Sequence, residues 1–406
     1  MIIPNKGMPI LPVKAYTSPD WFQLEQEHLF SNTWQFAGFV EDLKDPGDYL
    51  TVQCGLQNIL VVKGSDQQLR AFHNLCRHRG TQLLRAVGKK QQAITCPYHD
   101  WTYNLTGQLI SVPEKEKEFP DLEVKKICLH KASVGEWRGM LWVHPDPEAV
   151  SLKEWFGPIE PYLGPHEVSR LIEYPKTRYE KVIHANWKIV TENFLDVYHL
   201  AHLHAGTLNM YDHKKAEYGY VGPQYYFKEP LVPKFQENLD KLMPFKRIAE
   251  VTDDKLAAYV AWLFPNMGIT EAESSWSTFQ VVPLTVDTTK VIVRTKLEPT
   301  TIWAFTLQAG KSFRNWKKLI GFKTKYGKKP DKNSSDPLDW GDLMEEDIFA
   351  CEQQQKSLSN PLFAVKNTAK DAEMPVREFQ RLVQEWIIDK QSSGQHQLQE
   401  ESCQSI

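Results

Sequence analysis

Two groups of cysteine and histidine residues in this chain have the spacing of metal ligands. The first is Cys76-x-His78 followed, after seventeen intervening residues, by Cys96-x-x-His99. Two loops would each present one thiolate and one imidazole. This donor set can hold a tetrahedral zinc ion, or a [2Fe–2S] cluster in which histidine replaces cysteine on one iron.

The residues around this group favour the iron–sulfur cluster. Zinc ribbons usually pair two cysteines in each knuckle, whereas each pair here is mixed. The stretch CPYHDW, which begins at Cys96, resembles the Rieske cluster signature. The resemblance implies that Cys76 and Cys96 bind one iron while His78 and His99 bind the other. Many relatives have a small residue directly after the last histidine, and this chain has Asp100.

The second group lies within NWKIVTENFLDVYHLAHLHAGTL, residues 186–208. It contains two acids, an amide and three imidazoles: Glu192, Asp196, Asn193, His199, His202 and His204. Two histidines and one carboxylate, with further positions left open, form the site that non-haem Fe(II) uses in oxygen chemistry. The second group therefore indicates a mononuclear metal site.

Helix geometry leaves the pair of histidine ligands open. Asp196 and His199 are three residues apart, so they share a face of a helix. His199 and His202 would lie about 60° apart around a regular helix, and His199 and His204 about 140° apart. Geometry alone selects His202 as the second ligand, unless the helix ends or bulges in between.

The string E-N-F-x-D-x-Y-H-x4-H resembles the mononuclear-iron motif of Rieske non-haem iron oxygenases, in the catalytic (alpha) subunits of the aromatic-ring-hydroxylating family. The resemblance implies that His199 and His204 are the ligands, with a helix distorted between them. Asp196 is then not a ligand, and His202 is a pocket or surface residue. Asn193 lies near the iron by its place in the motif.

A third ligand is expected in residues 337–358, which read as a helix with four acidic residues near its start. Three of them fit a solvated face: Asp342, Glu345 and Glu346. Asp347 instead lies among apolar positions, where an ionised carboxylate is costly unless a cation meets it. The family's carboxylate ligand is the D of an E-D pair, which matches Glu346-Asp347. Glu346 is the alternative ligand, and an ordinary acidic first turn favoured by the helix dipole is the alternative without metal.

The resemblance also implies the architecture, which is of the α+β class. A small all-β Rieske [2Fe–2S] domain is expected at 34–148, after an entry segment at 1–33 that includes a short amphipathic helix. A larger catalytic domain, with an antiparallel helix-grip-like sheet wrapped by helices, is expected at 149–389. Residues 390–406 are polar and predict a disordered tail. Family members assemble as homotrimers, or as hexamers with a beta subunit.

In such rings the cluster of one chain lies close to the iron of its neighbour, while the two centres of one chain are far apart. Asp196 would then accept hydrogen bonds from His199 and from His99 of the next chain. Electrons come from NAD(P)H through a reductase, directly or through a ferredoxin. The chain shows no Gly-rich dinucleotide fingerprint, so the nicotinamide cofactor is expected to be used only indirectly.

The substrate is the least determined part of the interpretation. Aromatic residues between 211 and 227, with Trp262, Phe264 and Met267 further on, could contact an aromatic ring or cage a quaternary ammonium, or could be core of the sheet. The favoured interpretation is hydroxylation or demethylation of an aromatic or other cyclic small molecule. A monooxygenase of choline-, betaine- or carnitine-like compounds is the alternative, and Asp196 favours the former because some ammonium-oxidising relatives have Glu there.

The composition is that of an ordinary globular protein, with 406 residues, 41% hydrophobic, 24% charged and a net charge of −3. The near-neutral charge gives no indication of nucleic-acid or membrane binding, and no apolar run approaches the roughly 18 residues of a membrane span. Six cysteines are few for a disulfide scaffold, and the start is a poor secretory signal, so we expect a cytoplasmic enzyme.

The basic segment 311–332 reads as a solvated loop or as a docking surface for an acidic electron carrier. Two other classes of protein compete with an oxygenase. A plain Rieske electron carrier would hold no iron at His199, His204 and Asp347, and a structural zinc protein would contain no acid-labile sulfide.

Overall fold

A computed structural model of the protein describes most of the chain. The described residues are 10–237, 239, 243, 245–307, 323–363 and 367–392. The chain divides into two compact units. The smaller unit is Gln23–Trp155 with the chain from Trp386, and the larger unit is Phe156–Glu385 with the chain up to Phe22. The domain boundaries expected after residues 33, 148 and 389 stay predictions.

Two expected features fall largely outside the described residues. The basic segment 311–332 is described only from residue 323, and within that part Lys332 Nζ lies 3.7 Å from a carboxylate oxygen of Asp342. The predicted tail is described only to residue 392, where the chain is still helical, so the helix runs further than the sequence suggested.

The smaller unit contains two antiparallel sheets. The first has the strand order β1-β10-β9-β4-β3-β2-β5. Its strands are β1 Gln35–Phe39, β2 Tyr49–Cys54, β3 Gln57–Lys63, β4 Leu69–His73, β5 Val87–Gly88, β9 Lys131–Trp137 and β10 Met140–His144. The second, β6-β7-β8, comprises Ile94–Thr95, Thr102–Tyr103 and Leu109–Ser111. One Cys/His loop follows β4, and the other joins β6 to β7.

The larger unit is built on one seven-stranded antiparallel sheet in the order β11-β17-β16-β15-β14-β13-β12. Its strands are β11 Ile172–Ile183, β12 Glu217–Val221, β13 Gln224–Pro230, β14 Ala257–Leu263, β15 Met267–Ala272, β16 Ser275–Thr285 and β17 Thr288–Leu297. Because neighbouring strands pair antiparallel, side chains at opposite positions are neighbours and form rows that cross the sheet.

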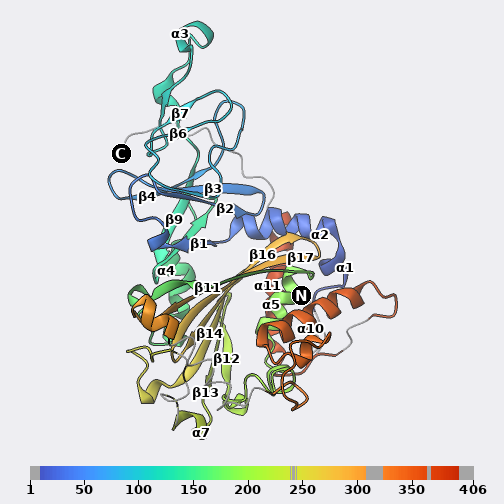
Figure 1. The fold of residues 1–406 in the computed structure, drawn as a ribbon. Coiled ribbons are helices and arrows are strands. Elements are labelled where there is room, and N and C mark those ends of the chain that lie inside the picture. Colours follow the sequence, from blue (N-terminus) through green and yellow to red (C-terminus); the bar gives the residue numbers. More distant parts are fainter. Residues whose placement is uncertain are drawn as a thin grey trace. The chain divides into compact units, whose positions relative to one another are not determined.

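The α-helices are α1 Lys14–Thr17, α2 Pro19–Leu24, α3 Lys115–Glu118, α4 Leu152–Phe156, α5 Trp187–Leu195, α6 Leu200–Leu203, α7 Pro233–Gln236, α10 Leu343–Leu358 and α11 Met374–Ser392. Short π or 3-10 turns include η1 Glu25–Leu29, η7 His213–Lys215 and η9 Pro337–Asp339. Helix α5 packs against β16 and β17, and α10 packs against α5, on one side of the sheet (Figure 1). Within the described part of the chain, none of the helices is both long and apolar enough to cross a membrane.

The predicted α+β class is confirmed, because helices accompany sheets whose strands all pair antiparallel. The helix expected at 337–358 starts later. A 3-10 turn ends at Asp339, and α10 begins at Leu343 after the extended residue Asp342.

Helix α5, which leads to the second histidine group, is held by a buried polar network. Its N-cap side chain, Asn186, accepts a hydrogen bond from the backbone of Lys188 at 3.0 Å. Glu192 Oε1 accepts from the Tyr16 hydroxyl of α1 at 2.5 Å and from Gln380 Nε2 of α11 at 3.1 Å. Burial raises the pKa of Glu192 to about 7, against the lowering effect of these two hydrogen bonds. The network therefore joins the two ends of the larger unit to α5.

We expect the Glu192→Gln variant to lose part of the pH dependence of stability. The folded-state pKa is raised from 4.5 to about 7, so the native protein keeps a proton that the unfolded chain releases. The associated stability is fully present below pH 4.5 and is lost as pH rises through about 7, a change of about 3 kcal/mol. Urea unfolding at about pH 5 and about pH 8 measures it. An equal loss in both proteins would show that another group titrates.

Candidate metal centres

The two Cys/His loops of the smaller unit have the same backbone hydrogen bonds. In each loop the cysteine N–H donates to the carbonyl five residues later, at 2.9 Å for both Cys76 and Cys96. The cysteine carbonyl accepts from the N–H four residues later, at 2.9 and 3.1 Å. That fourth residue has a left-handed backbone in both loops, Gly80 with φ +73° and Asp100 with φ +55°. The loops therefore present their cysteines in matching turns.

The four predicted cluster residues differ in exposure. Cys76 and Cys96 are buried, at 3% and 2% exposure, while His78 and His99 are half-buried. The two imidazole rings meet edge to face with centroids 4.7 Å apart, and Trp101 stacks on His78 at 4.8 Å. Two buried sulfurs behind two outward imidazoles suit a [2Fe–2S] cluster whose exposed iron has histidine ligands.

The groups around the cluster residues favour the protonation states that a cluster needs. Burial lowers the pKa of His78, as do the charges of His99 and Arg79, which favours the neutral imidazole that binds metal. The Tyr103 hydroxyl accepts a hydrogen bond from the Arg77 N–H at 3.0 Å. Its own proton is then free to point at Cys76 Sγ, 3.4 Å away, where a hydrogen bond would stabilise a thiolate.

The second histidine group lies where the helix breaks. Helix α5 ends at Leu195, and Asp196 has an extended backbone as its C-cap. The single turn α6 has His199 before it and His204 after it. The helix was expected to distort between the two predicted ligands, but the segment between them is the helical turn α6. The break instead lies before His199, at the extended residue Asp196, and the turn ends at His204. His202 is exposed and its ring packs on Tyr198, so it does not join the group.

Three donor atoms converge at this break. His199 Nε2 lies 3.1 Å from His204 Nε2, and Asp347 Oδ1 of α10 lies 3.6 Å from the former and 2.9 Å from the latter. These residues could hold one metal ion. Bonds of about 2.1 Å at right angles place neighbouring donors about 3.0 Å apart, and tetrahedral bonds place them about 3.4 Å apart. The observed spacing fits both geometries.

Each of the two imidazoles has a carboxylate on its other nitrogen. Asp196 Oδ2 lies 3.2 Å from His199 Nδ1, and Glu346 Oε2 lies 2.8 Å from His204 Nδ1. In the neutral form of each ring, these contacts place the proton on Nδ1 and leave the Nε2 lone pair for a metal ion. Burial lowers the pKa of His204, but hydrogen bonds and charge from Asp347 and Glu346 raise it more, to about 9.

The expectation that Glu346 lies on a solvated face is wrong. Its side chain is fully buried, and its Oε2 also accepts a hydrogen bond from the Thr207 hydroxyl at 2.8 Å. Glu345 is the member of the pair that faces outward, with Lys181 Nζ 2.6 Å away. Helix periodicity fixes the angle between neighbouring acidic residues but not which of them another segment covers, and here His204 and Thr207 cover Glu346.

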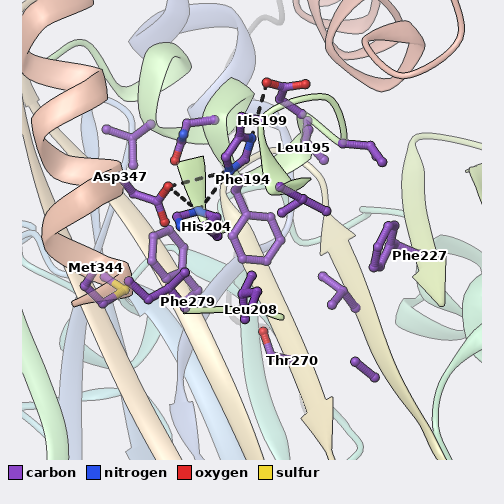
Figure 2. A pocket seen from close by; sticks show the side chains of 18 of the residues that line it. Phe194, Leu195, His199, His204, Leu208, Phe227, Thr270, Phe279, Met344 and Asp347 are labelled. Atoms are coloured by element: carbon purple, nitrogen blue, oxygen red, sulfur yellow. Dashed lines mark hydrogen bonds and ion pairs between the residues drawn. The ribbon is translucent and has the colours of Figure 1, made fainter. Parts of the chain in front are cut away.

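A cavity of about 340 Å³ opens beside the three donor atoms. Figure 2 shows His199, His204 and Asp347 turned toward one another, with rings and aliphatic side chains next to them. Its lining is mostly apolar and includes Phe194, Leu208, Phe227, Val260, Phe279 and Met344. Phe194 packs between Trp262 and Phe279, with centroid distances of 5.0 and 5.1 Å. Such a wall excludes water and suits an apolar ligand.

The structure separates the aromatic candidates into two sets. Tyr211, Tyr225 and Phe227 line the cavity, together with Asn193. Trp262, Phe264 and Met267 are fully buried core. The sequence interpretation did not single out Phe194, Thr207, Leu208, Glu229, Thr270 or Phe279. For Phe194 the available signal was its position between Asn193 and Asp196 in the motif.

Comparisons with known families agree with both centres. A model described as "Rieske [2Fe-2S] domain" matches residues 33–133. A model described as "Ring hydroxylating alpha subunit (catalytic domain)" matches residues 168–389, more than half of the chain. The two matches imply a Rieske cluster and a mononuclear iron, and they confirm the predicted pairing of a Rieske domain with a catalytic domain.

Relatives with assigned names fall into two groups. The glycine betaine monooxygenase oxygenase subunit of Chromohalobacter salexigens is 33% identical over 209 residues, 52% of this chain and 46% of the relative. Benzene 1,2-dioxygenase subunit alpha of Pseudomonas putida is 34% identical over 190 residues, 46% of this chain and 42% of the relative. The carnitine monooxygenase oxygenase subunit of Escherichia coli is 28% identical over 69% of this chain and 72% of the relative. In the first two matches the chain spans less than half the length of the relative.

Solved structures share the fold over nearly the whole chain. A quaternary ammonium Rieske monooxygenase in complex with L-carnitine has a TM-score of 0.69 and 21% identity, covering 94% of this chain and 95% of that one. Naphthalene 1,2-dioxygenase from Rhodococcus sp. has a TM-score of 0.68 and 18% identity, covering 93% and 94%. At these identities the likeness concerns the fold.

Variants at position 100 test whether this position requires the left-handed backbone conformation or the carboxylate of Asp100. Asp tolerates the left-handed region, whereas a β-branched residue there costs about 1–2 kcal/mol. We expect Asp100→Gly and Asp100→Asn to keep wild-type acid-labile sulfide and melting temperature, and Asp100→Val to lower both. Loss of sulfide in the Asn variant, which keeps the turn and removes the charge, would instead assign a role to the carboxylate.

Glu346 is expected to strengthen metal binding at His204. Replacing it by Gln leaves a weaker acceptor on Nδ1–H, and loss of such an outer contact typically lowers metal affinity about 10–100-fold. Glu345→Gln is the matched control, because that carboxylate pairs with Lys181. Fe(II) titration of anaerobic apo protein measures both variants. Equal affinity in the two variants would contradict the role given to Glu346.

Proposed function

Because this chain belongs to the ring-hydroxylating alpha-subunit family of Rieske oxygenases, we propose that it oxidises an aromatic or other cyclic small organic molecule with O2 and reductase-delivered electrons. The observation that carries the proposal is the convergence of His199, His204 and Asp347 beside an apolar cavity. An electron carrier has no need of a second donor set with its own cavity.

Each predicted residue has a role in this proposal. Two pairs hold the cluster: Cys76 with Cys96, and His78 with His99. His199, His204 and Asp347 hold Fe(II), and three protein ligands leave positions open for O2. When bound, the cluster supplies single electrons and the mononuclear iron supplies oxygen activation.

The side chains around the iron ligands orient and isolate the site. Asp196 and Glu346 hold protons on Nδ1 of His199 and His204, so both Nε2 atoms face the metal position. The wall formed by residues such as Phe194 packs an apolar substrate and excludes water. Asn193 also lines this cavity, and we assign it to the reaction site on that placement and on its position in the motif.

A separate reductase, acting directly or through a ferredoxin, would carry electrons from NAD(P)H. We propose a homotrimer, or a hexamer with a beta subunit, in which Asp196 joins His199 to His99 of the neighbouring chain. Asp196 suits this role because its side chain keeps partial exposure, 19%, while it contacts His199.

A monooxygenase of a quaternary ammonium compound is the second candidate. Five aromatic rings line the cavity and could surround a trimethylammonium group: Phe194, Tyr211, Tyr225, Phe227 and Phe279. The relatives named for glycine betaine and carnitine support it. Product analysis after incubation with benzene-type and betaine-type compounds, with a surrogate reductase, separates the two candidates.

The first experiment is iron and acid-labile sulfide per chain on anaerobically purified protein. An oxygenase requires about three irons and two sulfides, because the cluster contributes two of each and the mononuclear site one iron. About two irons and two sulfides, unchanged after Fe(II) loading, would reduce the chain to an electron carrier.

Asp196→Asn is expected to leave both metal sites filled and nearly abolish turnover, because the amide cannot serve as a charged acceptor between two imidazoles. The readouts are metal content, the rate of cluster reduction by a reductase, and the rate of cluster reoxidation in the presence of substrate and O2. Only the last should fall. Full activity in this variant would remove Asp196 from the electron path.

A further inference from the structure

The side chains that strand β13 contributes to the cavity wall change from aromatic to acidic along the strand. Tyr225, Phe227 and Glu229 alternate along it, so all three face the same side, and all three line the cavity. Tyr225 pairs with Trp262 of β14, which Phe194 contacts from α5, the helix that leads to His199. The Tyr225 end of the strand is therefore the end nearer the iron ligands.

Glu229 lies about 13 Å further along, at about 3.3 Å per residue. Its cross-strand neighbour is Ala258, which also lines the cavity and leaves room beside the carboxylate. Phe227, between the two ends, lies apart from the three iron-ligand candidates (Figure 2). The cavity wall is thus apolar near the three candidate iron ligands, and it carries a carboxylate at its far end.

The Glu229 carboxylate is only half satisfied. The residue is 4% exposed, and His213 Nδ1 lies 2.7 Å from its Oε2. Among the described residues, Oε1 has no hydrogen-bond partner. A carboxylate in an apolar wall gains stability when a donor or cation that enters the cavity meets its second oxygen.

The hydroxyl group of Tyr211 also favours a ligand that donates hydrogen bonds at this end of the cavity. Tyr211 also lines the cavity, and its hydroxyl donates to Glu273 Oε2 at 3.3 Å, so its oxygen is free to accept. Burial raises the pKa of Tyr211 well above its usual value, as do the charges of Glu273 and Glu229. The far end therefore offers acceptors and negative charge.

We propose that Glu229 binds the head group of the substrate, and that the substrate is an apolar molecule with a protonated amine at the end away from the oxidised carbon. An ammonium group has donors and no acceptor, which matches the acceptors at this end. The inference rests on the proposed function, since it places the substrate body beside the iron ligands.

Equilibrium binding to the metal-loaded protein, without reductase, tests the head group separately from catalysis. The probes share one body: 4-phenylbutylamine, 4-phenylbutan-1-ol and butylbenzene. We expect the amine to bind about tenfold more tightly than butylbenzene, with the alcohol between them, because a charged hydrogen bond is stronger than a neutral one. Equal or weaker binding of the amine overturns the proposal, whatever the iron and sulfide analysis shows.

Variants of Glu229 test whether this residue causes the tighter binding of the amine. Glu229→Gln should weaken amine binding about tenfold while changing butylbenzene binding less than about twofold. Glu217→Gln, which replaces an exposed carboxylate on the adjacent strand β12, is the matched control and should change neither. If Glu229→Gln does not fold, Glu229→Asp keeps the charge and should retain part of the amine preference. Loss of both probes together in a folded Glu229 variant contradicts a head-group role.

Discussion

The larger unit depends on one constraint: three donor atoms must be held close together with their lone pairs facing one position. His199 Nε2, His204 Nε2 and Asp347 Oδ1 lie 2.9–3.6 Å apart. With each Nδ1 proton directed at a carboxylate, the three atoms repel one another unless a metal ion or a further proton lies between them. The pKa of His204 is lowered by burial but raised more by Asp347 and Glu346, to about 9, so a proton on Nε2 takes this place when no metal is bound. Metal binding at this site is therefore coupled to the release of that proton.

Holding these atoms together requires parts of the chain far apart in sequence. His199 and His204 flank α6, while Asp347 comes from α10. Helix α5, which leads into this turn, is tied through Glu192 to α1 and α11. Gly268 contributes by its lack of a side chain, since a Cβ there would lie 2.7 Å from Phe194. The sheet can thus approach α5 closely at Gly268.

The sequence predicts local features well and tertiary ones poorly, for physical reasons. Cysteine and histidine spacing within short loops determines which donors can meet, so the cluster candidates needed no knowledge of the fold. Helix periodicity alone selected His202, because nothing local shows that α5 ends before His199. Only the family motif indicated His204. Glu346 was assigned to solvent because adjacent acidic residues do not reveal which one another element covers.

The sequence did not predict that Glu229 lines the cavity, because a carboxylate on an antiparallel strand normally faces water. Here the alternation puts it on the same face as Tyr225 and Phe227, toward a cavity. The cavity then has carboxylates at both ends. A metal ion would neutralise Asp347, whereas Glu229 has the His213 ring 2.7 Å from one of its two oxygens. A substrate with one cationic group has one favourable orientation, and β13 sets the distance from that group to the iron. On this argument, the position that is oxidised follows from the length of the substrate rather than from recognition of its ring.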